Sequence, residues 1–229
     1  VSALAARQME VIIVNTTHPG LRIPAFYTIV PGAHFRERAL NTSVGLFASK
    51  LLSETMPPRE AIAQLMEVER RLPGKYYTSF YLGDCHLNLN DPQSAQAHFR
   101  EALRREPTPQ DAASICSYLG VSLKEMGKYR DALTVLRQGT GFDDERTDIY
   151  NLMGFCHYQL KEHAAAIECF KKVIGLDPSS AIDYANIGSN YREMGNTQEA
   201  VRHYMLALEL DPAIEFAAEA LKRLMASEE

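Results

Sequence analysis

Two Cys-His pairs are the residues of this chain with the clearest capacity for chemistry. They are Cys85-His86, in the stretch GDCHLNL, and Cys156-His157, in the stretch GFCHYQL. Thiolate and imidazole are common zinc ligands, and they also form nucleophile and base couples in enzymes. The pairs therefore suggest a metal site, a catalytic site, or packing residues that recur for structural reasons.

A repeat in the sequence decides between these readings. Glycines recur at intervals of 37, 34 and 34 residues, and a small, a bulky and a turn-forming residue follow each glycine at fixed distances. The glycines are Gly83, Gly120, Gly154 and Gly188; the alanines twelve residues later are Ala95, Ala132, Ala166 and Ala200; the bulky residues are Phe99, Leu136, Phe170 and Tyr204; and the prolines are Pro107, Pro178 and Pro212, with Asp144 at that place in the second unit.

This order of residues resembles the tetratricopeptide repeat, which has a period of 34 residues. The resemblance covers about 76–214, with three extra residues near 110–112. It implies an all-α fold, a right-handed superhelix of antiparallel helix pairs. The expected pairs are 76–89 with 92–105, 112–126 with 129–138, 147–160 with 163–175, and 181–194 with 197–209.

The repeat argues against a metal site shared by the two Cys-His pairs. Both pairs follow their glycine by the same offset, in the first and third units. Neighbouring helices pack about 8–10 Å apart, whereas zinc ligands lie about 2.0–2.3 Å from the ion. We interpret the pairs as packing residues. Because no HExxH, GxSxG or GxxxxGK[ST] motif occurs either, we expect no metal, no cofactor and no catalytic residue in this chain.

Further elements are expected on both sides of the four units. Residues 42–75 are interpreted as a degenerate helix pair, with Ala61, Leu65 and Pro73 in repeat phase and Ser49 at the glycine position. Residues 215–229 are expected to form a helix that covers the apolar end of the stack. Its charged residues should point outward; these are Glu215, Glu219, Lys222 and Arg223.

Residues 1–41 have a different composition. Two β-rich runs, VIIV at 11–14 and AFYTIV at 25–30, are separated by turn formers and predict a short two-stranded β segment. Exposed strand edges favour pairing with other chains, so self-association through this segment is one hypothesis.

The stretch EVIIVNTTHPGLRIPAFYTIVPGAHFRERA also resembles the closing part of the YcaO-type ATP-utilising domain. The matching residues are Val11–Val14, Thr17, Leu21, Ile23, Pro24, Val30, Pro31 and Gly32, while Asn15 replaces the usual acidic residue. The resemblance implies the C-terminal part of a larger protein that modifies peptide bonds with ATP, and no catalytic residue is carried over. The alternative is a strand pair that belongs to another small domain.

Composition excludes other classes of function. The net charge is -5, which gives no general reason to expect nucleic acid or an anionic membrane as partner. No apolar run is long enough to cross a bilayer. The four cysteines are scattered without a CxxC motif, which suits a reducing compartment, and we expect a cytoplasmic protein.

The expected function is therefore that of a scaffold that binds a protein or peptide segment in the concave groove, where first helices line the surface. Only Asn151 and Asn186 fall near the pattern of repeats that clamp a C-terminal carboxylate. The alternatives are that neighbouring elements cover the groove aromatics, or that the chain is an accessory part of an ATP-dependent enzyme. The predicted groove residues are Tyr77, Phe80, Asp84, Leu87, Val121, Lys124, Asn151, Phe155, Tyr158, Ser189 and Arg192.

Overall fold

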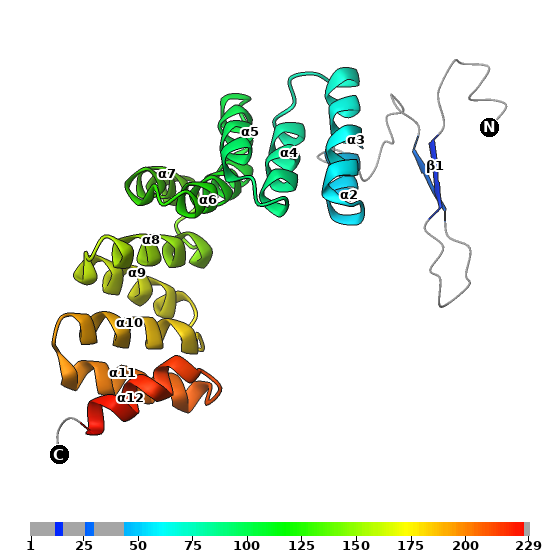
Figure 1. The fold of residues 1–229 in the computed structure, drawn as a ribbon. Helices are drawn as coiled ribbons and strands as arrows, with labels where there is room; N and C mark the ends of the chain where they lie inside the picture. The colour runs from blue at the N-terminus through cyan, green and yellow to red at the C-terminus, as the bar shows by residue number, and fades with distance from the viewer. Residues whose placement is uncertain (1–11, 16–25, 30–43, 227–229) are drawn as a thin grey trace, which may run out of the picture. The chain divides into compact units, whose positions relative to one another are not determined.

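The computed structural model describes residues 12–15, 26–29 and 44–226. Within these ranges it contains two strands and eleven helices, shown in Figure 1. The chain divides into two compact units, residues 1–73 and residues 74–229, and each is described by itself.

The first unit contains both strands and one helix pair. Strands β1 (Ile12–Asn15) and β2 (Phe26–Ile29) pair antiparallel, with Ile12 opposite Ile29. The rest of 1–41 lies outside the described residues, so the extent of the predicted β segment beyond these strands and the YcaO resemblance stay predictions.

The helix pair of the first unit is formed by α2 (Val44–Thr55) and α3 (Pro58–Arg71), as the repeat phase predicts. Pro58 stands at the first position of α3, where a missing N–H costs no helical hydrogen bond. Ser49, Ala61 and Leu65 are fully buried. The small and bulky positions inferred from the repeat phase therefore do belong to a packed interior.

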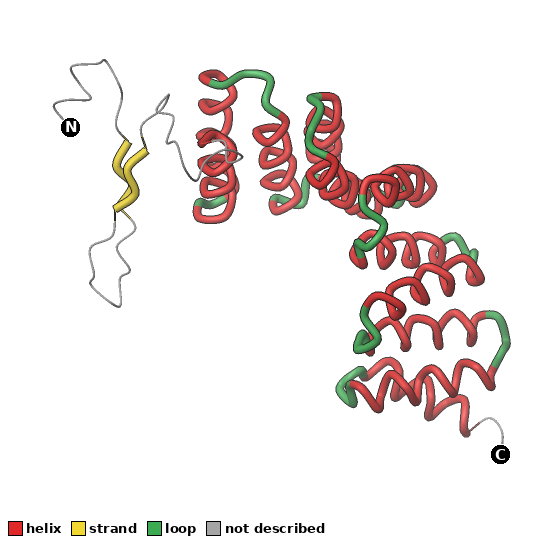
Figure 2. Tube along the Cα trace, turned by 180° about the vertical axis from the view of Figure 1, so that it is seen from behind, coloured by secondary structure: helices red, strands yellow, loops and turns green. Residues whose placement is uncertain are grey.

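The second unit is a succession of antiparallel helices in which each helix packs against the next, as Figure 2 shows for the trace. Helices that are neighbours but one also touch: α4 with α6, α6 with α8, and α10 with α12. The helices are α4 (Tyr76–Asn88), α5 (Pro92–Arg104), α6 (Pro109–Glu125), α7 (Tyr129–Phe142), α8 (Thr147–Gln159), α9 (His163–Leu176), α10 (Ala181–Glu193), α11 (Thr197–Leu210) and α12 (Glu215–Ala226).

Each helix pair closes on contact between a glycine and a bulky residue. A Cβ atom built on Gly154 would lie 2.6 Å from the Phe170 ring, and one on Gly188 would lie 3.0 Å from the Tyr204 ring. The four repeat alanines are fully buried beside these contacts. The period of the sequence is therefore the period of helix-to-helix approach.

The turn between the two helices of a pair has the same geometry in all four repeats of 76–214. In the first repeat Asn90 has φ +58°, its N–H bonds to Leu87 O, and the next N–H bonds to His86 O. Gly127, Lys161 and Gly195 take the same role with positive φ. This left-handed C′ residue with two backward hydrogen bonds ends an α-helix while satisfying its last carbonyls.

In the second repeat both helices, α6 and α7, differ from the predicted boundaries. Helix α6 starts at Pro109 rather than near 112, because Thr108 caps it by accepting the Asp111 N–H at 3.2 Å. Helix α7 continues to Phe142 rather than ending near 138. A Cβ on Gly139 would lie 2.8 Å from Ile149 and 2.9 Å from Cys116, so this glycine allows close packing inside the helix.

Helix α12 covers the end of the stack, as expected from its sequence. Ala217 and Ala220 of α12 are buried in one apolar cluster with Ala185 of α10 and Tyr204 of α11. The helix therefore adds a wall beside α10 as well as a cap on α11.

Candidate functional site: a hollow between α8, α10 and α12

The two Cys-His pairs have matching structural roles. Cys85 and Cys156 are both fully buried, and Cys156 belongs to the main apolar cluster of the second unit. His86 Nδ1 lies 3.2 Å from the carboxylate of Asp91, and His157 Nδ1 lies 2.7 Å from that of Glu162. Each histidine thus ties the end of the first helix of a pair to the start of the second.

The packing interpretation extends to the other cysteines. Among the described residues no group of three or more His, Cys, Asp or Glu side chains is placed to hold a metal ion. Burial raises the pKa of the Cys116, Cys156 and Cys169 thiols to about 11. A thiol with so high a pKa is protonated near neutral pH and is a poor nucleophile.

A hollow, here called the C-terminal hollow, has a volume of about 640 Å³ and lies between α8, α10 and α12. Its apolar surface is formed by Phe155, Tyr158, Phe170, Ile182 and Phe216. Phe155 is 39% exposed although it lies in the middle of α8. A space of this size with aromatic walls is in the range of ligand-binding sites.

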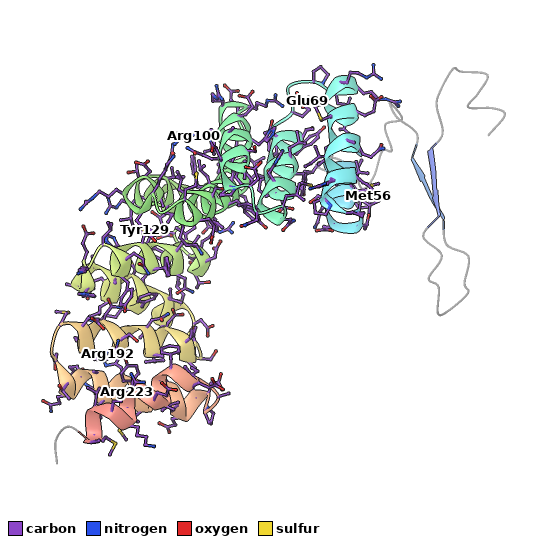
Figure 3. The ribbon with its side chains drawn as sticks, viewed as in Figure 1. Met56, Glu69, Arg100, Tyr129, Arg192 and Arg223 are labelled. Atoms are coloured by element: carbon purple, nitrogen blue, oxygen red, sulfur yellow. The ribbon has the colours of Figure 1, made fainter. Side chains whose placement is uncertain are left out.

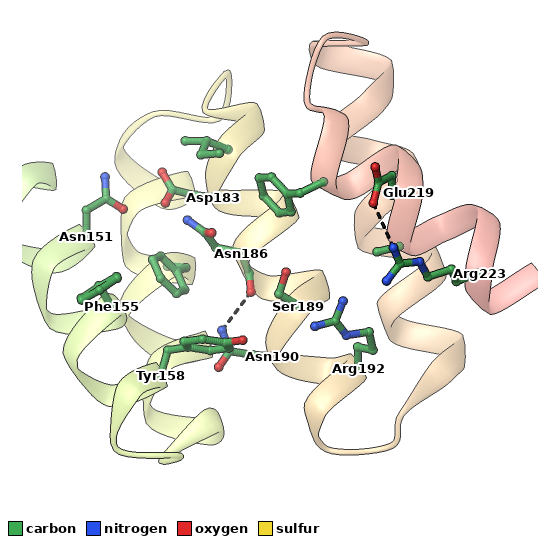
Figure 4. Close-up of a pocket in the computed structure, with 14 residues that line it drawn as sticks. Asn151, Phe155, Tyr158, Asp183, Asn186, Ser189, Asn190, Arg192, Glu219 and Arg223 are labelled. Atoms are coloured by element: carbon green, nitrogen blue, oxygen red, sulfur yellow. Dashed lines mark hydrogen bonds and ion pairs between the residues drawn. The ribbon is translucent and has the colours of Figure 1, made fainter.

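Polar side chains line one side of the C-terminal hollow. Asn151, Asp183 and Asn186 lie next to one another, as Figure 4 shows. Asp183 is fully buried, and its Oδ2 accepts a hydrogen bond from Ser180 at 2.6 Å. Burial raises the pKa of Asp183, and its contacts with Ser180, Asn186 and Asn151 offset this rise only in part.

Two arginines line the other side. Arg192 of α10 and Arg223 of α12 lie at the same end of the helix stack (Figure 3). Arg192 pairs with Glu193 at 2.7 Å, and Arg223 pairs with Glu219 at 3.1 Å. The hollow therefore has hydrogen-bond acceptors near Asp183 and cationic donors near α12.

A smaller depression, here called the N-terminal hollow, lies between α4 and α6. It has a volume of about 390 Å³, and Asp84, Leu87, Tyr118, Val121 and Glu125 contribute to it. Its two charged lining residues, Asp84 and Glu125, are both acidic.

Three stretches of the chain match the tetratricopeptide repeat family: residues 77–109, 147–180 and 184–214. Each stretch coincides with a helix pair of the second unit. The chain contains tetratricopeptide repeats (TPRs). The pair α6 and α7, between the first two matched stretches, has the same glycine contact and the same turn.

Solved structures agree with this fold. YrrB, described as a TPR protein with an unusual peptide-binding site, has a TM-score of 0.69 at 20% identity, over 78% of this chain and 90% of that one. MamA from Desulfovibrio magneticus scores 0.67 at 21% identity, over 75% and 98%. The C-terminal part of a TPR protein from Cytophaga hutchinsonii scores 0.70 at 19% identity, over 80% and 71%.

A curated relative is similar in sequence. The probable UDP-N-acetylglucosamine–peptide N-acetylglucosaminyltransferase SEC of Arabidopsis thaliana is 31% identical over 122 residues, or 53% of this chain. The chain spans only 12% of the length of that protein.

The predicted groove residues lie in three different places in the structure: the C-terminal hollow, the N-terminal hollow and the packing between helices. Asn151, Phe155, Tyr158, Ser189 and Arg192 line the C-terminal hollow. A second group, made up of Asp84, Leu87 and Val121, lines the N-terminal one.

The remaining three predicted residues belong to the packing between helices. Tyr77 is only 4% exposed, and its ring lies edge-on to that of Tyr76, so its prediction as a contact residue is wrong. Phe80 packs against Phe99 and Tyr118. Lys124 lies over the Phe155 ring, 5.2 Å from its centroid, and thereby connects the second repeat to the rim of the C-terminal hollow.

Several residues of the C-terminal hollow were not predicted from the sequence as groove residues. Asp183 and Asn190 are on α10, and Phe216, Glu219 and Arg223 are on α12. Glu219 and Arg223 do point away from the apolar core, as expected, but they also form one wall of the hollow. The sequence signal that pointed to this part of the hollow was Asn186, which stands two residues before the repeat glycine Gly188 on α10.

No helix in the described part of the chain is both long enough and apolar enough to cross a membrane.

Proposed function

We propose that this chain is a protein-interaction scaffold whose TPR stack binds a segment of a partner protein in the C-terminal hollow. The observation that supports this most strongly is Phe155. Its side chain is 39% exposed and lines a hollow that also offers amides, a carboxylate and arginines. An exposed aromatic among convergent polar groups is the usual composition of a binding hot spot.

The shape of the hollow supports a peptide-like ligand. Its walls come from α8, α10 and α12, so a bound segment would contact several helices at once. TPR proteins act as protein-interaction scaffolds, and YrrB is described as having a peptide-binding site. The concave surface of such solenoids suits an extended or helical segment.

A wider role follows from the YcaO resemblance. In this proposal the TPR stack is the C-terminal part of a larger YcaO-like protein, and the alternative is an accessory portion of an ATP-dependent peptide-modifying enzyme. Only β1 and β2 of the resembling stretch are described. Calorimetric titration with ATP and Mg²⁺ tests the alternative: we expect no heat of binding, and saturable binding by this chain would favour the enzyme role.

The test of the scaffold function is affinity capture from lysate with three immobilised proteins. These are the wild type, Phe155→Glu and the matched control Phe142→Glu, whose phenylalanine is 44% exposed at the end of α7 and lies outside both hollows. We expect a protein that is retained by the wild type and the control and lost from Phe155→Glu. Circular dichroism checks that each variant is folded. Equal retention by all three would refute the site.

A further inference from the structure

The interfaces between successive first helices contain a recurring hydrogen bond. Near the start of each first helix, a carboxylate meets a side chain of the preceding first helix. Tyr76 of α4 donates its hydroxyl to Asp111 of α6 at 2.7 Å, and Ser117 of α6 donates its hydroxyl to Asp148 of α8 at 2.7 Å. Both carboxylates thus receive a proton donor from the neighbouring repeat.

At the third interface the side chains of Asn151 and Asp183 are in contact, but the structure shows no hydrogen bond from the Asn151 amide to the carboxylate. Asn151 of α8 stands three residues before its repeat glycine, as Ser117 does on α6, and lies beside Asp183 of α10 in Figure 4. Asp183 Oδ1 and Asn151 Oδ1 are both buried, and neither has a hydrogen-bond partner among the described residues. Buried acceptors without a donor destabilise the free protein. A ligand that supplies N–H donors here forms hydrogen bonds that are missing in the free protein, and these bonds favour binding.

The two unpartnered oxygens define what the missing group must be. Both are acceptors, so the group needs at least two N–H donors, and the carboxylate favours a positive charge. Phe155 and Tyr158 line the same hollow and offer aromatic surface to an aliphatic stem or a cation. A lysine or arginine side chain meets all of these conditions.

The other charges around the hollow are compatible with a cation. Arg192 and Arg223 are paired with Glu193 and Glu219, and Lys124 pairs with Glu125 at 2.8 Å. Burial raises the pKa of Asp183, which reflects a carboxylate without a compensating positive charge.

We propose that the C-terminal hollow selects partner segments by a basic side chain, lysine or arginine, whose cationic head inserts between Asn151 and Asp183. This rests on the proposed function of the hollow and specifies its ligand. Asp183 is covered in the free protein, so the half-buried Asn151 amide turns aside as the cation enters. Rotamer changes of this size are common at interfaces.

A selection experiment tests the proposal without knowledge of the natural partner. A phage library of random twelve-residue peptides is panned against the wild type, Phe155→Glu, Asp183→Asn and Glu209→Gln. Glu209→Gln removes one negative charge from an exposed site on α11 that lies outside the hollow, as a control for net charge. Asp183→Asn keeps the size of the side chain and an oxygen that accepts from Ser180.

We expect wild type and Glu209→Gln to enrich peptides with a lysine or arginine at one shared position, and Asp183→Asn to lose that enrichment. Peptides that depend on Phe155 but show no basic position would overturn the basic-anchor proposal while leaving the scaffold function intact. Failure to enrich any peptide that depends on Phe155 would refute both.

A selected peptide then gives a test on the unaltered protein. Acetylation of its anchor lysine, or exchange of an anchor arginine for citrulline, removes the charge. We expect about tenfold weaker binding to the wild type, the scale of a charged hydrogen bond. Asp183→Asn should weaken binding of the unmodified peptide by a similar factor, and it should not weaken binding of the modified peptide any further. Equal affinities of both peptides for the wild type would show that the contact is closed within the protein, by water or by the Asn151 amide.

Discussion

At the scale of single residues, the packing of the TPR stack depends on glycines, which leave room for a bulky side chain of the neighbouring helix. Gly154 brings α8 against Phe170 of α9, and a methyl group at this position would overlap the ring at 2.6 Å. We predict that Gly154→Ala lowers the free energy of unfolding by roughly 1–3 kcal/mol, because an added carbon overpacks the interface. Urea unfolding followed by circular dichroism measures the change.

The control for this prediction is Gly175→Ala in α9. Nothing lies within 4 Å of a Cβ built at Gly175, so only helix propensity changes, and we expect stability to be equal or higher by up to about 1 kcal/mol. Equal losses at both glycines would contradict the packing argument.

The buried thiols give a second prediction at this scale. Burial raises the pKa of Cys116, Cys156 and Cys169 to about 11 from an ordinary 9.0. The folded chain therefore keeps protons that the unfolded chain loses, and these groups reduce stability as pH rises from about 9 towards 11.

We expect an aromatic disulfide reagent to react slowly with the native protein at about pH 8 and with all four cysteines after denaturation. Rapid reaction of the native protein would show that the thiols are accessible, as catalytic or metal-binding thiols have to be. Zinc added to the native protein should leave the melting temperature unchanged.

At the scale of elements, the hairpin turn of each TPR needs a left-handed residue. Lys161 holds φ +60° at the place where Gly195 stands in the next repeat. A side chain in this region costs about 1–2 kcal/mol, partly offset by the greater freedom of glycine when unfolded. We predict that Lys161→Gly raises unfolding free energy by up to about 1 kcal/mol and that Gly195→Ala lowers it by about 1 kcal/mol, as measured by urea unfolding. Changes of the opposite sign would refute the turn geometry.

Most helix boundaries could be predicted because proline, glycine and capping residues act locally. Asp91, for instance, caps α5 by accepting the Ser94 N–H at 3.1 Å, as its position before Pro92 predicts. The extension of α7 through Gly139 could not be predicted in this way. A glycine reads as a helix end in the sequence, and only its contact with Ile149 and Cys116 shows why it lies inside one.

At the scale of the whole molecule, the candidate site was predicted in part. The groove offsets identified Phe155 and Tyr158 because each lies on the first helix of a pair and follows the repeat period. They did not identify Phe216, since the approach of α12 to α10 depends on packing at the end of the stack. The unpartnered oxygen of Asp183 likewise depends on two helices at once.

The self-association hypothesis also belongs to this scale. If strands near the N-terminus pair between chains, deletion of residues 1–40 should lower the mass measured by light scattering. An unchanged mass would refute the hypothesis, and the C-terminal hollow would remain the candidate interface.

The central claim is that a partner segment occupies the C-terminal hollow. The most direct measurement is hydrogen–deuterium exchange of the wild-type chain with and without a saturating selected peptide. We predict slower exchange in α8, α10 and α12, which line the hollow, and little change in α5 and α7. Protection confined to α4 and α6, or to the second helices of the pairs, would contradict this account.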